Sequence, residues 1–281
     1  MKERKGFLYY FLRNRNGMIG LAGVMLIVLI GLVGSVFIPK PDGYTMDILQ
    51  APSAAHLLGT DNIGLDIFAE LVWGARTSLY VSILAMLISA AIGIPLGLIC
   101  GYGNGFLREI IDAFIDVFMT LPMLPLMIIM AAVMGTSITN VAIILGIFSW
   151  PQLARVTKNS TLKIRQMQYI EACSCLGLSK FRILFKHILL NASGPVFVNM
   201  TLIMASAVLT EASLSFLGLG DPTTWSWGTM LKRAWSQNAV ISSPNPWWWW
   251  LMPSLCIVVY VVCFNLLGTA INDCLNPKGR E

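Results

Sequence analysis

Long stretches of this sequence contain no charged residue at all. No charge occurs between Arg76 and Arg108, and none between Asp116 and Arg155. A helix needs about 20 apolar residues to cross the roughly 30 Å hydrocarbon core of a bilayer, so these stretches predict membrane-spanning helices. The composition agrees, because 56% of the 281 residues are hydrophobic and only 12% are charged, about half the charge of a soluble domain. We therefore interpret the chain as an all-α membrane protein and exclude soluble and disordered classes.

Six membrane-spanning helices are predicted from the apolar runs. The first covers residues 18–38; its apolar run is too long for a signal peptide and no cleavage site follows it. The others cover residues 77–101, 114 to a polar turn at 135–140, that turn to 156, 192–216 and 249–271. Pro122 and Pro125 predict a bend or break in the third helix, and Pro151 predicts one in the fourth.

Basic residues lie mainly on one side of the predicted membrane. With the N-terminus in the cytoplasm, 15 of the 19 Lys and Arg residues are cytoplasmic, which is the bias expected of bacterial membrane proteins. Both termini are then cytoplasmic. The four outer basic residues are Lys40, Arg76, Lys232 and Arg233. This bias explains the net charge of +5, so no nucleic-acid partner is needed.

The predicted organisation has four parts. They are a cytoplasmic segment over residues 1–17, a first span with its outer loop over 18–76, a core of five helices over 77–277 and a cytoplasmic tail over 278–281. Within the core, residues 163–186 form a cytoplasmic loop and residues 218–248 form an outer loop. Four consecutive tryptophans at 247–250 are typical of an aromatic belt at the membrane interface.

No catalytic or metal-binding motif is present. The sequence contains no G-x-x-x-x-G-K-[ST] phosphate loop, no H-E-x-x-H and no G-x-S-x-G, which are the patterns that carry nucleotide, zinc-protease and hydrolase chemistry. It has only two histidines, and its six cysteines lie mostly in apolar runs or beside basic loops. We therefore predict no enzyme activity, no disulfide framework and no metal site.

Several residues in or near the spans predict particular contacts. Asp112 and Asp116 lie one helical turn apart and are expected to pair with Arg108 or an N-terminal arginine, while Glu211 is expected to pair with a partner chain or cap the following loop. Glycines at 93, 97 and 101 form a face that allows close helix packing. A polar stripe lines either a water-filled path or a hydrogen-bonded helix contact, and it consists of Asn199, Ser206, Thr210 and Ser213.

The cytoplasmic loop 163–186 is predicted to contain two helices joined by a tight turn. The first helix ends near Leu176, Gly177 takes the left-handed conformation, and Ser179 caps the second helix. Glu171, Ala172, Leu176 and Phe181 favour docking on another protein. The alternative is a basic amphipathic loop that lies on anionic lipid.

At this loop the chain resembles binding-protein-dependent ABC importer permeases. The residues that carry the resemblance are Glu171-Ala172-Cys173, Gly177 and Ile188-Leu189, which match an E-A-A…G…I-L-P pattern. The segments on either side of this loop resemble the second permease subunit of dipeptide, oligopeptide and nickel systems. These segments are residues 56–61, 64–66, 74–79, 211–220, 226–231, 264–268, 273 and 276–277. Departures from the family pattern are Leu65 for Arg, Cys173 for Ala, Leu190 for Pro, and an altered C-terminal motif.

The resemblance implies a type I ABC importer permease fold with a cytoplasmic coupling helix, in the bacterial cytoplasmic membrane. It implies a homologous permease as heterodimer partner, two ATPases that bind ATP and Mg, an extracytoplasmic solute-binding protein, and no cofactor in this chain. The implied coupling residues are Glu171, Ala172, Cys173, Leu176, Gly177, Ser179 and Arg182. The implied binding-protein contacts are Asp61, Asp66, Trp225 and Trp227, and the polar stripe is the expected path.

The function expected from the resemblance is ATP-driven import of short peptides. One alternative keeps the architecture and changes the substrate to nickel or another metal chelate. A second alternative is a stand-alone secondary transporter or channel, which predicts buried charge pairs or inverted repeats.

Overall fold

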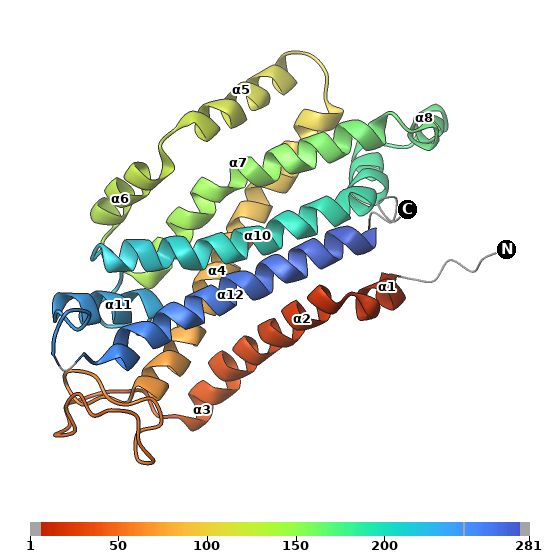
Figure 1. Ribbon diagram of the computed structural model, residues 1–281. Coiled ribbons are helices and arrows are strands. Elements are labelled where there is room, and N and C mark those ends of the chain that lie inside the picture. The colour runs from red at the N-terminus through yellow and green to blue at the C-terminus, as the bar shows by residue number, and fades with distance from the viewer. Residues whose placement is uncertain (1–6, 244, 276–281) are drawn as a thin grey trace.

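The computed structural model describes residues 7–243 and 245–275. Within these ranges the chain is helical with irregular connections and no strand, and its single β-bridge joins Thr60 to Asp66. The long helices lie side by side along one direction (Figure 1). The all-α prediction is therefore confirmed. The long helices are α4 (Ile67–Tyr102), α7 (Ile138–Arg165), α10 (Leu189–Phe216) and α12 (Trp247–Leu275).

The first span forms as one helical run from Arg15 to Phe37. It follows a short helix, α1 (Phe7–Arg13), and consists of α2 (Arg15–Val28), a π-helical segment η1 (Leu29–Gly34) and α3 (Ser35–Phe37). Asn14 caps α2 by accepting a hydrogen bond from the backbone N–H of Gly17 at 3.1 Å. The run packs against α12, where Gly20 lies so close that a Cβ would stand 2.7 Å from the backbone nitrogen of Leu267.

Four helical runs of the described residues are long and apolar enough to cross a membrane. They are residues 15–37, 67–102, 180–216 and 247–275. A fifth crossing is formed if α5 (Phe106–Thr120) and α6 (Met123–Met134), which meet at an 87° bend, are one span. The bend lies next to Pro122, where the sequence predicts it. The helix α7 is unbroken through Pro151, so no break occurs there, and the count of six spans stays a prediction.

The glycine face on α4 is a packing surface against α7, as predicted. A Cβ at Gly93 would lie 2.8 Å from the carbonyl oxygen of Trp150, and one at Gly97 would lie 2.5 Å from that of Ala154. At Gly101 it would lie 2.5 Å from the Cβ of Thr161. The two helices approach along this face because no side chain separates their backbones.

The predicted partners of Asp112 and Asp116 are wrong. Asp112 pairs with Lys158 and Asp116 pairs with Arg155, both on α7, rather than with Arg108 or an N-terminal arginine. The reason is geometric, because α7 passes beside α5 and presents two cations one turn apart to two acids one turn apart. Of the N-terminal basic residues, those at positions 2, 4 and 5 lie outside the described residues.

Reversing the half-buried Asp112–Lys158 pair tests this contact. Asp112→Lys should lower the free energy of unfolding by about 1–2 kcal/mol, between the values for exposed and buried pairs. The double variant Asp112→Lys/Lys158→Asp should recover most of the loss, as measured by thermal unfolding of the purified protein in detergent. A double variant no more stable than the single one would contradict the pairing.

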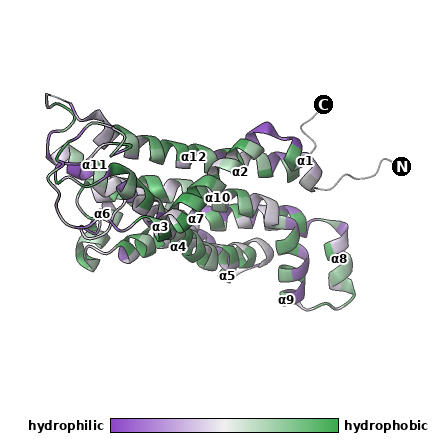
Figure 2. Ribbon diagram, turned by 90° about the horizontal axis from the view of Figure 1, so that it is seen from below, coloured by the Kyte–Doolittle hydropathy of each residue, from purple (hydrophilic) through white to green (hydrophobic). Residues whose placement is uncertain are grey.

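Hydrophilic residues gather at the two ends of the bundle (Figure 2), near α9 (Lys180–Arg182) at one end and near α11 (Trp227–Ser236) at the other. The helix α1, the C-terminal end of α12 and α8 (Gln168–Cys175) lie at the first of these ends (Figure 1). Some helices extend into segments predicted as loops. α4 begins at Ile67, inside the predicted outer loop, and α11 forms within the loop 218–248. The predicted tail over 278–281 and the matched positions 276–277 lie outside the described residues.

Candidate functional site

The helix α8 lies at one end of the bundle (Figure 1). It follows α7 in the chain and precedes α9, η2 (Ile183–Ile188) and α10. Ile170 is its one buried residue. This side chain packs into an apolar cluster with Leu98 of α4, Ile164 of α7 and Ala192 of α10, together with Ile183 and Ile188. α8 is therefore anchored through Ile170 to a cluster that three long helices share, and its remaining residues are exposed or half-buried.

A Schellman motif ends α8, as the sequence predicts. Gly177 has φ +74°, the left-handed conformation that favours glycine. Its N–H donates to the carbonyl of Ser174 at 3.0 Å, and the N–H of Leu178 donates to the carbonyl of Cys173 at 3.2 Å. Ser179 then caps α9 by accepting from the N–H of Arg182 at 3.4 Å. The turn fixes the angle between the two short helices.

The exposed residues of α8, of the turn after it and of α9 combine one acid with apolar side chains. Glu171 and Ala172 are exposed, Leu176 is 81% exposed, and Phe181 is 71% exposed. Glu171 forms no ion pair within the residues that the structure describes. Cys173 is half-buried against the apolar cluster, and Arg182 is exposed. An apolar patch at the polar end of the bundle is typical of a protein-binding surface, and we call Glu171, Ala172, Leu176 and Phe181 the docking face.

Behind the docking face, Arg165 joins the end of α7 to the α4–α5 turn. Its guanidinium carbon lies 5.5 Å from the ring centroid of Tyr102, and its Nη1 donates to Oδ1 of Asn104 at 3.0 Å. Arg165 therefore links the end of α7 to the end of α4 and to the turn that follows it.

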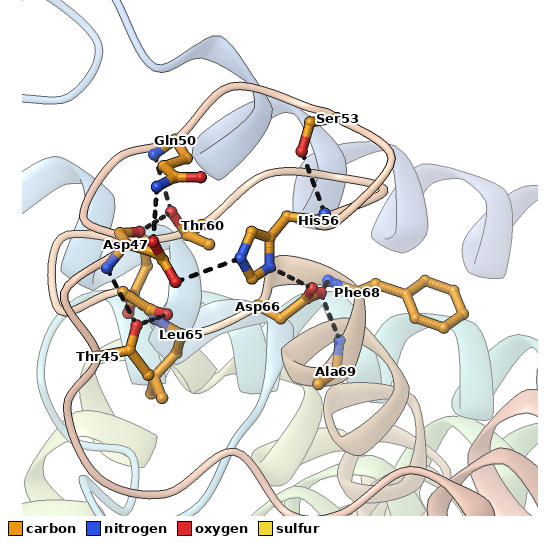
Figure 3. Close-up of polar contacts among 12 residues, drawn as sticks. Thr45, Asp47, Gln50, Ser53, His56, Thr60, Leu65, Asp66, Phe68 and Ala69 are labelled. Atoms are coloured by element: carbon orange, nitrogen blue, oxygen red, sulfur yellow. Dashed lines mark hydrogen bonds and ion pairs between the residues drawn. The ribbon is translucent and has the colours of Figure 1, made fainter.

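At the opposite end, the loop between α3 and α4 is held by a network around His56 (Figure 3). Its Nδ1 lies 3.0 Å from Oδ2 of Asp66, and its Nε2 lies 3.7 Å from Oδ2 of Asp47. Asp66 also caps α4, because its Oδ1 accepts from the N–H of Phe68 at 2.8 Å. One imidazole thus fastens the loop to the start of a long helix.

Removing this imidazole should loosen the loop without unfolding the bundle. His56→Ala is expected to destabilise the loop by about 1–2 kcal/mol through loss of two polar contacts, and so to increase protease cleavage between residues 45 and 60 about tenfold. Limited proteolysis from the outer side measures this rate. Leu57→Ala, which removes an exposed neighbour, is the control, and equal rates for the two variants would contradict the assignment.

Three of the four predicted outer contacts are buried in this chain. Asp61 is fully buried, and its Oδ1 accepts from the N–H groups of Ile63 and Leu65 at 2.9 and 2.7 Å. Trp225 Nε1 donates to the carbonyl of Pro41 at 3.1 Å, and Trp227 Nε1 donates to that of Leu71 at 3.2 Å. Asp61 thus stabilises its own loop, Trp225 joins the two loops, and Trp227 joins the second loop to α4. Asp66 alone of the four is partly exposed.

Two further predicted features lie at this end of the bundle. Of the tryptophan run, Trp248 and Trp249 are buried rather than interfacial, and Trp248 donates to the carbonyl of Thr60 at 3.1 Å. Glu211 is buried inside this chain and accepts from the hydroxyl of Ser215, one turn later, at 2.7 Å. Its Oε2 has no hydrogen-bond partner in the described part of the chain, so a contact with a partner chain stays a prediction. These contacts join sequence-distant segments, which periodicity cannot reveal.

The polar stripe on α10 divides between the inside and the surface of the chain. Asn199 is buried, and its Oδ1 has no hydrogen-bond partner in the described part of the chain. The hydroxyls of Ser206, Thr210 and Ser213 donate to carbonyls of their own helix at 2.9–3.0 Å. They bond no neighbouring helix, and Ser206 is exposed.

Comparison with known proteins gives a consistent result. The family model described as "Binding-protein-dependent transport system inner membrane component" matches residues 93–281. The chain is 36% identical to the glutathione transport system permease protein GsiD of Pectobacterium atrosepticum, over 95% of this chain and 89% of that protein. It is 34% identical to the oligopeptide permease OppC of Bacillus subtilis, over 99% and 90%, and 34% identical to the dipeptide permease DppC of Haemophilus influenzae, over 98% and 95%.

Solved structures support the fold. Two inward-facing crystal forms of the MetNI methionine ABC transporter match with TM-scores of 0.57 and 0.59 at 20% and 19% identity. The matches cover 72% and 73% of this chain and 96% and 95% of the other chain. The type I importer architecture is therefore shared by the part of the chain that these matches cover.

Proposed function

The chain belongs to the family of binding-protein-dependent transport system inner membrane components, and from this premise we propose that it forms half of the pathway of an ATP-driven peptide importer. Family membership makes it a permease component of the bacterial inner membrane, served by ATPase and substrate-binding partners. Family membership also disfavours the alternative of a stand-alone secondary transporter or channel. The proposal adds that the chain has no catalytic activity, that both termini face the cytoplasm, and that ATP and Mg bind only to the partner ATPases.

The docking face on α8 is the observation that carries the proposal. An ATPase groove that receives Leu176 and Phe181 covers exposed apolar surface, and a cation beside it pairs with Glu171. When the ATPases close on ATP, they move α8 as a rigid unit because the Schellman turn fixes its end. Ile170 then transmits this displacement to α4, α7 and α10 through the buried cluster.

A homologous permease is proposed to complete the pathway. The pair α5–α6 buries few of its side chains, and its exposed apolar residues include Phe106, Ile110 and Phe114. We propose that a second permease covers this face. The hydroxyl groups of Ser206, Thr210 and Ser213 on α10 would then line the path between the two chains. The heterodimer and the path residues are both parts of the proposal.

The proposed substrate is a short peptide, supported by the names of the relatives, which transport glutathione, dipeptides and oligopeptides. Nickel or another metal chelate is the alternative within the same architecture. Titration of the cognate solute-binding protein with dipeptides and with nickel decides between them, since selectivity is proposed to reside largely in that protein.

Loss of the ATPases from a docking-face variant tests the coupling assignment. Leu176→Asp is expected to reduce co-purification of the ATPases with the permeases at least about tenfold, because it places a charge in an apolar contact. Ile241→Asp, which changes an equally exposed residue at the outer end (80% exposed), should leave the complex intact. Full recovery of the ATPases with Leu176→Asp would overturn the assignment.

A further inference from the structure

A pocket of about 320 Å³ lies at the outer end of the bundle, where α10 ends and α11 passes over it. α11 contributes one face, Thr229, Lys232, Arg233 and Ser236, spaced three, one and three residues apart. The turn after α10 contributes Gly218 and Gly220, and the α6–α7 turn contributes Thr136. The pocket thus carries two adjacent cations.

The two cations are held in place by different contacts. The guanidinium carbon of Arg233 lies 3.9 Å from the ring centroid of Trp225, and its Nη2 donates to the carbonyl of Pro222 at 3.3 Å. The ammonium of Lys232 lies over Gly218, where a Cβ would stand only 2.7 Å from Nζ. Glycine at 218, with φ +91°, therefore leaves the space that the lysine occupies.

The charge of Lys232 is not balanced within the described residues. No acidic side chain lies within ion-pair distance of it there, whereas Lys40, another outer basic residue, faces Asp42 at 3.9 Å. Arg233 interacts electrostatically with the buried Glu70. In the described part of the chain, the lining of the pocket contains Lys232 and Arg233 and no acidic residue. Two adjacent cations without a carboxylate in the lining make the pocket attractive to an anion.

We propose that this pocket binds a carboxylate group, and that the C-terminal carboxylate of the incoming peptide occupies it. The identity of that carboxylate rests on the proposed function; the pocket's anion preference does not. Every unmodified peptide has a C-terminal carboxylate, whatever its side chains. Two cations in the pocket therefore bind peptides of varied sequence. A carboxylate on the solute-binding protein offers the same chemistry and is the second source to be tested.

The local charge is tested with a reporter cysteine in the complete transporter. Ser236→Cys is made together with Cys175→Ser, which removes an exposed native thiol. The reaction rates of the reporter with an anionic (sulfonatoethyl) and a cationic (trimethylammonioethyl) methanethiosulfonate are then compared. The anionic-to-cationic ratio should exceed that of Ser53→Cys, an exposed outer-loop control, by about tenfold. Adding Lys232→Gln should remove most of the excess, while adding Lys40→Gln should leave it.

Protection experiments then identify the carboxylate. Dialanine should slow labelling of the reporter cysteine in the absence of binding protein, and dialanine amide should not. If only the binding protein protects the reporter, and Lys232→Gln weakens its affinity for the transporter at least tenfold, the carboxylate is supplied by that protein. A reporter without anionic preference, equal protection by dialanine and its amide, or no protection by either source would overturn the proposal.

These outcomes are separable from failure of the proposed function. If the pocket is wrong and the importer is right, ATP-driven uptake proceeds while the reporter cysteine shows no anionic preference. If the importer is wrong, uptake fails in every variant whatever the labelling ratio.

Discussion

Replacing Glu171 by arginine is expected to reduce ATP-driven uptake by about 30-fold or more while the chain still inserts and folds. Glu171 is exposed on α8 and unpaired among the described residues, so the change costs no contact within this chain. At the contact with the ATPase it replaces an attraction by a repulsion, a change of about 2 kcal/mol or more for a central charged residue. Uptake per assembled complex in proteoliposomes is the measurement.

The matched control is Glu109→Arg. Glu109 is an exposed acid in the first turn of α5, at the same end of the bundle, and its reversal changes the net charge equally. Normal uptake is expected for this variant. Normal uptake by Glu171→Arg would contradict the assignment of α8 as the coupling helix.

Replacing Gly97 by leucine is expected to prevent accumulation of folded protein. A Cβ at this position would lie 2.5 Å from the carbonyl oxygen of Ala154 and 2.6 Å from the Cβ of Thr157. Neither atom is the end of a flexible side chain, so relief requires α4 and α7 to separate along their length. Overpacking in a core costs about 1–3 kcal/mol when side chains adjust, and we expect about 3 kcal/mol or more here.

The measurement is the yield and thermal midpoint of the detergent-purified protein, read by size-exclusion chromatography after heating. Ala91→Leu, on the exposed side of the same helix, is the control and should behave like the unchanged protein. A folded Gly97→Leu protein with an unchanged midpoint would show that the two helices do not pack along this face.

Features determined by local chemistry could be predicted from the sequence. Charge-free runs predict the long helices because the requirement to bury backbone polar groups in lipid is general. Gly177 and Ser179 predict the turn after α8 because a left-handed residue and an N-cap depend on neighbours a few residues away. Glycines at 93, 97 and 101 predict a packing face by spacing alone.

Features determined by distant segments could not be predicted in this way. The spacing of Asp112 and Asp116 indicates a shared face but not which helix passes it, so it does not identify α7 as the partner. The segments that contain Trp225, Trp227 and Trp248 have a composition typical of an exposed or interfacial loop. Each is buried because its indole N–H reaches a backbone carbonyl in another segment, a contact that only the folded chain brings together.

Reconstitution tests most directly whether this chain moves substrate only when ATPases act on α8. The permease pair is placed in liposomes with and without the ATPases, and ATP-dependent entry of the substrate that the cognate binding protein binds is measured. We expect uptake only when ATP, both ATPases and the loaded binding protein are present, and no uptake by this chain alone. Uptake by this chain alone, without an ATPase, would contradict coupling through α8.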